Sequence, residues 1–190
     1  MWVEWMRVIT GISKGKKLIS SKDNFIRPTS DKVKMGIFNV LSHGNINFHF
    51  ENSVVLDLFS GSGALGIEAL SRGANHCLFV DKSRESLSIC EKNIINCNFI
   101  EKSSSKLFDI KSNRDFNNGA NFDLIFADPP YNNDFVPIIF NFLTNNKLFK
   151  KGSLIVIEES IDQKLTTNEG FEQIDRKVYG KTQVLFFEVI

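Results

Sequence analysis

Short apolar runs alternate with segments of helical periodicity from residue 54 onward. The apolar runs are Val54 to Phe59, Cys77 to Val80, Phe99-Ile100, Phe122 to Ala127 and Leu154 to Ile157. Helical spacing separates them at Ala64 to Ser71, Ser86 to Asn96 and Phe135 to Phe142. This alternation is typical of a mostly parallel sheet covered on both faces. At the end of the chain, runs 171–178 and 183–189 around Gly180 predict an antiparallel hairpin at the edge of an α/β fold.

The first 50 residues follow a different pattern. Apolar and polar side chains alternate from about Val3 to Phe25, and Gly11 and Gly15 provide turns, which predicts a short hairpin. The stretch 27–31 then supplies a stop and a cap for a helix with apolar positions 33, 37, 38, 40 and 41, ending near residue 44. We therefore expect an N-terminal extension over residues 1–50 and a main domain over 51–190.

The composition agrees with an ordinary globular protein. The chain has 190 residues, of which 42% are hydrophobic and 24% are charged. No apolar run approaches the roughly 18 residues that a membrane helix needs, and no secretory signal is visible, so we expect a cytoplasmic protein. The three cysteines, Cys77, Cys90 and Cys97, have no C-x-x-C spacing and are interpreted as buried thiols. Neither they nor the three histidines predict a metal site.

Charge is distributed unevenly along the chain, although the net charge is only +1. Residues 1–43 hold eight basic and three acidic side chains, whereas residues 44–190 hold 15 and 19. A basic segment on a near-neutral domain suits contact with a polyanion, because neutralised phosphates release counterions. Charge alone leaves a solvated surface as an equal alternative.

A glycine loop follows the first strand of the main domain. Gly61-Ser62-Gly63-Ala64-Leu65-Gly66 fits G-x-G-x-x-G between a predicted strand and a predicted helix, and Asp81 ends the next strand. Glycines allow close approach of a ligand, and the acid is placed to accept ribose hydroxyls, so an adenosine-containing cofactor is predicted. Asp57, just before the loop, favours a cofactor with a cationic group such as S-adenosylmethionine over a pyrophosphate. Alternatively, Asp57 caps amide groups of the loop itself.

A second motif follows the strand Phe122 to Ala127. Asp128-Pro129-Pro130-Tyr131 should lie beside the glycine loop, because ligand crevices form beyond the carboxyl ends of parallel strands. The prolines stiffen the turn and leave a carboxylate and a backbone carbonyl as acceptors, with an aromatic ring beyond them. This arrangement fits a planar group that carries an NH2. Hydrogen bonds to that amine would orient its lone pair toward a methyl donor, and Tyr131 would stack on the base.

With these motifs the sequence resembles the class I S-adenosylmethionine-dependent methyltransferases, and within them the RsmD family of bacterial 16S rRNA guanine-N2 methyltransferases, which act on guanine 966. The segments that carry the resemblance are Arg7 to Gly11, Gly15 to Leu18, Arg27 to Lys34, Phe38-Asn39, Leu56 to Gly66, Glu68 to Ala74 and Asp128 to Tyr131. The block that begins Arg27-Pro28-Thr29 is the family-specific part. Met35 stands where the family usually has Glu.

The resemblance implies a Rossmann-like methyltransferase sheet and a role for each matching position. S-adenosylmethionine would contact Asp57, Phe59, Gly61, Ser62, Gly63, Asp81 and Ser104. Ser104 is included because Ser103-Ser104-Ser105 stands where many class I enzymes carry an acid or amide after the third strand. The target guanine would be held by the catalytic residues Asp128, Pro129, Pro130 and Tyr131. The small-subunit 16S rRNA would face Arg7, Lys17, Arg27, Thr29 and Lys32, and the enzyme is expected to act as a monomer without a metal.

Three alternatives stay open at this point. The tetrapeptide also occurs in similar adenine-N6 methyltransferases, so another nucleic-acid amine could be the target. A nicotinamide-dependent dehydrogenase shares the glycine loop and Asp81 but has no use for the turn at Asp128. A ribosome assembly factor without catalysis would keep the fold and the basic segment.

Overall fold

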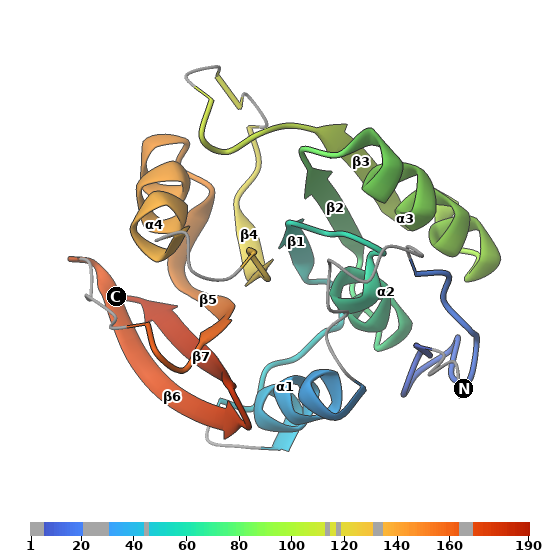
Figure 1. The fold of residues 1–190 in the computed structure, drawn as a ribbon, viewed down its shortest axis with the longest axis horizontal. Helices are drawn as coiled ribbons and strands as arrows, with labels where there is room; N and C mark the ends of the chain where they lie inside the picture. Colours follow the sequence, from blue (N-terminus) through green and yellow to red (C-terminus); the bar gives the residue numbers. More distant parts are fainter. Residues whose placement is uncertain are drawn as a thin grey trace.

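One seven-stranded sheet organises the molecule (Figure 1). The computed structural model describes residues 6–20, 31–43, 46–112, 115–116, 119–130, 135–163 and 169–190. The strand order is β3-β2-β1-β4-β5-β7-β6. The strands are β1 (Val54–Leu58), β2 (His76–Asp81), β3 (Ser103–Leu107), β4 (Phe122–Ala127), β5 (Phe149–Ser160), β6 (Phe171–Tyr179) and β7 (Thr182–Val189). Strands β1 to β5 pair in parallel and β7 pairs antiparallel with both β5 and β6, which confirms the expected α/β fold and its terminal hairpin.

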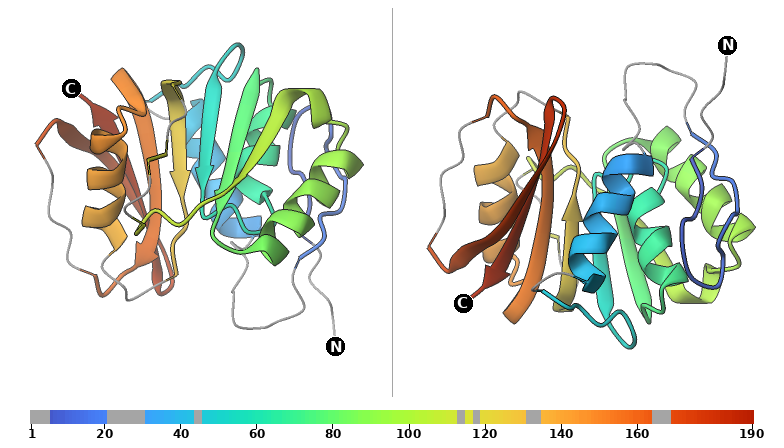
Figure 2. Two further views of the ribbon diagram at one scale, coloured as in Figure 1. Left: turned by 90° about the horizontal axis from the view of Figure 1, so that it is seen from above. Right: turned by 90° about the horizontal axis from the view of Figure 1, so that it is seen from below.

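The helices cover both faces of the sheet (Figure 2). They are α1 (Asp31–His43), α2 (Ala64–Ser71), α3 (Arg84–Asn96) and α4 (Phe135–Asn145). Helices α1, α2 and α3 pack in one hydrophobic cluster, and α4 packs in the other together with Phe108 and Phe116. Side chains alternate along the inner strands β1, β2, β4, β5 and β7 and contribute to both clusters. On β1, for example, Val55 belongs to the first cluster and Leu56 to the second. The helices α1, α2, α3 and α4 were all predicted, with ends that shift by at most a few residues.

The third strand is where the sequence-based prediction was wrong. Phe99-Ile100 does not form a strand: Phe99 is buried in the core and Ile100 begins a short 3-10 turn, Ile100–Lys102. The strand next to β2 is β3, Ser103–Leu107, which begins with three serines. Because β3 is the outer strand of the sheet, its side chains are half-buried or exposed, and no apolar run marks it.

The predicted N-terminal hairpin is present in residues 6–20, hereafter the N-terminal segment. An antiparallel bridge joins Arg7 and Lys17, and Val8 N–H donates to the Lys16 carbonyl while Leu18 N–H donates to the Met6 carbonyl. The rest of the predicted hairpin, residues 3–5 and 21–25, lies outside the described residues. The N-terminal segment and α1 share the core of the main domain: Met6, Val8 and Leu18 belong to the α1–α3 cluster. Phe38 of α1 packs against Phe126 of β4 with ring centroids 5.6 Å apart. Residues on both sides of position 50 pack in one core, so the boundary does not separate two cores. That residues 1–50 and 51–190 have different functions stays a prediction.

No helix in the described part of the chain is both long enough and apolar enough to cross a membrane.

Helix α2 approaches the sheet so closely that Gly66 has no room for a side chain. A Cβ at this position would lie 2.4 Å from Cε1 of Phe79 and 2.6 Å from Sγ of Cys77. We therefore expect Gly66→Ala to lower the free energy of unfolding by about 1–3 kcal/mol, as overpacking of a core does. Urea denaturation measures this, with Ser88→Ala on the exposed face of α3 as a neutral control. Equal midpoints for Gly66→Ala and wild type would contradict the packing argument.

Candidate active site

The carboxyl ends of the parallel strands bring the two sequence motifs together. Leu58 of β1 pairs with Val80 of β2 on one side and with Ala127 of β4 on the other. Phe59, Asp81 and Asp128 therefore begin or adjoin the loops at one edge of the sheet. This is the edge at which parallel α/β sheets form ligand crevices.

The glycine loop, Gly61 to Gly66, has the strained backbone that close approach requires. Phe59, just before the loop, adopts φ 61°, and Gly63 adopts φ 80° at the start of α2. A Cβ on Gly63 would lie 2.5 Å from Sγ of Cys90 on α3. The loop is thus packed closely against α3. A positive φ in a phenylalanine costs free energy and is typical of functional sites.

Two carboxylates anchor the loop from beneath. Gly66 N–H donates to Asp57 Oδ2 and Gly61 N–H donates to Asp81 Oδ2, both at 2.9 Å. Asp81 Oδ1 accepts a further bond, at 2.8 Å, from Ser83 N–H. Asp57 is only 2% exposed. The structure therefore shows the alternative in which Asp57 caps an amide group at the end of the loop.

Burial raises the pKa of Asp57 to about 8. The hydrogen bond from Gly66 N–H opposes this shift, and the nearby charge of Asp81 adds to it. The carboxyl group is consequently protonated over most of the range below pH 8, so it contributes less negative charge to the site than its position in the sequence suggests.

A pocket lies beyond the ends of β2, β3 and β4, beside Phe59 and the start of α4. Its lining comprises Phe59, Val80, Asp81, Lys82, Phe108, Asp109, Ile110, Pro130 and Phe135. Phe59 and Phe135 meet edge to face, with centroids 5.1 Å apart. Apolar and aromatic walls with two carboxylates match the chemistry of a nucleoside, whose flat base needs apolar contact and whose amine and hydroxyls need acceptors.

Ser104, where the adenine contact is expected, lies within β3 and does not line the pocket. Ser104 pairs with Leu78, three residues before Asp81, so it lies about 10 Å short of the carboxyl edge. Its Oγ lies 2.9 Å from Nε2 of His76, the first residue of β2. The acid after the third strand is Asp109, which lines the pocket. Sequence reasoning missed Asp109 because it placed the third strand too early.

The Asp-Pro-Pro turn adjoins this pocket. Asp128 is half-buried, Pro129 is buried and Pro130 lines the pocket. Tyr131, expected to stack on the target base, lies outside the described residues.

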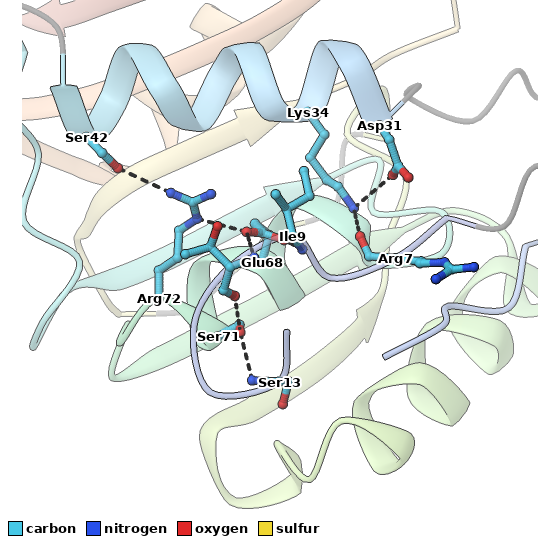
Figure 3. A network of polar contacts seen from close by, with 10 residues as sticks. Arg7, Ile9, Ser13, Asp31, Lys34, Ser42, Glu68, Ser71 and Arg72 are labelled. Carbon is cyan, nitrogen blue, oxygen red and sulfur yellow. Dashed lines mark hydrogen bonds and ion pairs between the residues drawn. The ribbon is translucent and has the colours of Figure 1, made fainter. Parts of the chain in front are cut away.

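The basic residues expected to face RNA lie on the N-terminal segment and the start of α1. Arg7 and Lys17 are exposed and are brought together by their bridge, and Lys32 is exposed in the first turn of α1. Arg27 and Thr29 lie outside the described residues. Figure 3 shows the Arg7 guanidinium pointing away from the polar network that holds the Arg7 backbone.

That network centres on Glu68 of α2, which is fully buried (Figure 3). Its carboxylate accepts hydrogen bonds from Ile9 N–H at 2.7 Å, Thr10 N–H at 3.0 Å and Arg72 Nε at 2.9 Å. Burial of an acid is tolerated because it is paired and hydrogen-bonded. The one sequence signal for it is an acid within the otherwise apolar helix 64–71, and its partners in the N-terminal segment could not be foreseen.

Lys34 of α1 extends the same network and is also fully buried. Its Nζ donates to the carbonyl oxygen of Arg7 and lies 3.5 Å from Asp31 Oδ1. Desolvation lowers the pKa of Lys34, whereas the charge of Asp31 opposes the shift. Two buried charges of opposite sign, on α1 and α2, thus hold neighbouring backbone groups of residues 7–10.

Comparison with known proteins identifies the family. Residues 6–188 match the family described as conserved hypothetical protein 95. The chain belongs to this family, the RsmD family. It is 32% identical to the putative rRNA methyltransferase YlbH of Bacillus subtilis, over 96% of this chain and 98% of that protein. Ribosomal RNA small subunit methyltransferase D of Haemophilus influenzae is also 32% identical, over 92% of this chain and 89% of that protein.

Solved structures agree with this assignment. The putative methyltransferase yhhF from Escherichia coli superposes with a TM-score of 0.81 at 26% identity, covering 96% of this chain and 97% of that one. The RsmD-family chain is therefore a methyltransferase. The dehydrogenase and the non-catalytic assembly factor, considered from the sequence, find no support in these relatives.

The raised pKa of Asp57 gives a pH dependence of stability with a definite sign. The folded state keeps a proton that the unfolded state loses near pH 3.8, so this group's stabilising contribution is complete below pH 4 and is lost as pH rises toward 8. Asp57→Asn resembles the protonated form at every pH. Its advantage in unfolding free energy over wild type should grow between pH 5 and 8 by up to about 1.4 kcal/mol per pH unit. Urea denaturation at several pH values tests this, and parallel curves for the two proteins would contradict it.

Proposed function

We propose that this RsmD-family methyltransferase uses S-adenosylmethionine to methylate the N2 amine of a guanine in the 16S rRNA of the small ribosomal subunit. The observation that carries the proposal is the meeting, at one edge of the sheet, of a pocket lined by aromatic rings and two carboxylates and the Asp128-Pro129-Pro130 turn. The names of the small-subunit relatives support the choice of rRNA.

Different residues of the pocket would contact different parts of the cofactor. Asp81 would accept from the ribose hydroxyls, Asp109 from the adenine amine, and the rings of Phe59 and Phe108 would contact the base. The backbone of Gly61, Ser62 and Gly63 would border the methionine end, where Asp57 holds the loop in place. When bound, S-adenosylmethionine supplies a methyl carbon that its sulfonium has already activated.

The Asp128 turn would orient the target amine. Its carboxylate can accept from both N1–H and N2–H of guanine, and a backbone carbonyl of the stiff turn can accept the second N2–H. These bonds direct the nitrogen lone pair toward the methyl carbon, and Tyr131 would hold the base by stacking. As the N–C bond formed, the C–S bond would break, S-adenosylhomocysteine would leave, and the proton released from the amine would pass to solvent.

The basic groups would bind the RNA backbone. Arg7, Lys17, Arg27 and Lys32 would neutralise phosphates, so affinity should fall as salt rises. The Thr29 hydroxyl would donate a hydrogen bond to a phosphate oxygen. In this proposal residues 1–50 serve the RNA and residues 51–190 serve the chemistry. We infer that a monomer acts on small subunits in the cytoplasm.

The experiment that tests the proposal is transfer of labelled methyl from S-adenosylmethionine to small subunits that lack the modification, followed by nucleoside analysis. N2-methylguanosine at one site is the expected product. N6-methyladenosine would refute the target base, and binding of S-adenosylmethionine without transfer to the subunit would refute the substrate.

Substitution of two acids of the site should impair two different properties, the rate of methyl transfer and the affinity for the cofactor. Asp128→Asn removes an acceptor for the target amine, so kcat should fall by about 100-fold or more while the affinity for S-adenosylhomocysteine changes little. Asp109→Asn places an amide donor near the adenine amine and should weaken S-adenosylhomocysteine binding about tenfold or more. Isothermal titration calorimetry and single-turnover kinetics separate the two effects, with the exposed Asp162→Asn as control. Equal loss of cofactor affinity in Asp128→Asn would refute its assignment to the base.

A further inference from the structure

Asn93 of α3 connects two parts of the molecule that lie far apart in the sequence. The side chain is fully buried. Its Nδ2 donates to the carbonyl oxygens of Ile19, at 2.8 Å, and Ser62, at 2.9 Å. Its Oδ1 accepts from Ile19 N–H at 2.7 Å. Both amide protons are therefore used, one for the N-terminal segment and one for the glycine loop.

The two bonds to Ile19 fix the amide plane against the N-terminal segment. Ile19 lies two residues beyond Lys17, which in turn is bridged to Arg7. A weaker contact joins the same two parts, since Ser62 Oγ donates to Met6 Sδ at 3.8 Å. A shift of the backbone at Ser62 therefore changes the bonding of the amide that holds Ile19, and the reverse is equally true.

Among the described residues, the two aspartates that anchor the glycine loop do not contact the N-terminal segment through their bonds to the loop. Asp57 and Asp81 are on strands, and their bonds to Gly66 and Gly61 stay within the main domain. Glu68 and Ser71 bind the N-terminal segment but lie in α2, beyond the turn of the loop. Asn93, by contrast, forms hydrogen bonds to the backbone of both the glycine loop and the N-terminal segment.

We propose that Asn93 is a positioning residue that couples the cofactor pocket to the RNA-facing surface, so that each ligand strengthens binding of the other. The inference rests on the proposed function, which places the cofactor at the glycine loop and the RNA at Arg7 and Lys17. A ligand that orders Ser62 also orders Ile19 through the shared amide, and the second ligand then has less conformational entropy to lose. Linkage requires the effect to be equal in both directions.

The competing explanation is that Asn93 only stabilises the fold. A purely structural role would lower stability and weaken each ligand by itself, but it would leave the ratio of affinities with and without the other ligand unchanged. The test therefore measures that ratio.

The first measurement needs no RNA. Hydrogen exchange is followed by mass spectrometry on peptides that contain Ile19, with and without S-adenosylhomocysteine. In wild type, the ligand should slow exchange at Ile19 about fivefold or more, and in Asn93→Ala the slowing should disappear. The control is Asn96→Ala: Asn96 lies one turn further along α3 and donates to the Lys17 carbonyl at 3.0 Å, and its side chain is exposed. This variant should keep the slowing.

The second measurement uses unmodified small subunits. Their dissociation constant is determined with and without saturating S-adenosylhomocysteine, and we expect about fivefold tighter binding with it for wild type and for Asn96→Ala. For Asn93→Ala the ratio of the two dissociation constants should fall to about one. The variant should bind subunits less tightly than wild type, and this loss should be smaller without S-adenosylhomocysteine than with it.

Each result has a separate meaning. A wild-type protein that binds S-adenosylhomocysteine without slowed exchange at Ile19 overturns the coupling, even if Asn93→Ala does not fold. Retention of the wild-type ratio by a folded Asn93→Ala overturns the role of Asn93. Loss of slowing in Asn93→Ala, together with no binding of subunits by wild type, supports the coupling but refutes the proposed substrate. Absence of S-adenosylhomocysteine binding by wild type refutes both.

Discussion

The site depends on one requirement, that backbone polar groups removed from water must find hydrogen-bond partners. The N-terminal segment and the glycine loop have little regular secondary structure to supply such partners. Side chains of the main domain supply them instead: Glu68 for Ile9 and Thr10, Asn93 for Ile19 and Ser62, Asp57 for Gly66 and Asp81 for Gly61. Glu68, Asn93 and Asp57 are buried. Each of these three would be costly to bury without a partner, and the hydrogen bonds to the backbone offset that cost.

This arrangement explains how a short basic segment can be placed accurately on a catalytic domain. Within residues 6–20 the two sides of the hairpin are joined by the Arg7–Lys17 bridge and by three backbone hydrogen bonds. An isolated two-stranded pairing of this size is marginally stable, so it needs the packing of the main domain to hold Arg7 and Lys17 in position. Helices α1, α2 and α3 fix the segment from three directions, and the same helices form one cluster with the sheet. The basic surface proposed to face RNA and the pocket proposed to accept the cofactor are consequently attached to one packed core.

Sequence reasoning succeeded where the signal is local. The apolar runs of β1, β2 and β4 mark strands that are buried on both faces, and the glycines at 61, 63 and 66 mark a turn with positive φ values and a close helix–sheet contact. The prediction failed at β3, because the sequence of this outer strand has no apolar pattern. The third strand was therefore placed too early, so Ser104 was chosen as the residue that follows it and Asp109, which lines the pocket, was missed. For Asp57 the sequence left two roles open, and burial of the side chain with a bond to Gly66 shows the capping role.

The sequence by itself determined the α/β architecture, the glycine loop, the Asp-Pro-Pro turn and the basic character of the first 43 residues. Each of these features depends on the type and spacing of residues that are neighbours in the chain. Only the tertiary structure decided which polar residues are buried and what they bind. Glu68 and Asn93 look like ordinary helix residues in the sequence, and their partners are 58 or 59 and 74 residues away, respectively, in the N-terminal segment. Hydrogen bonds between such distant positions produce no periodic pattern in the sequence, since they depend on how helices and loops pack against the sheet.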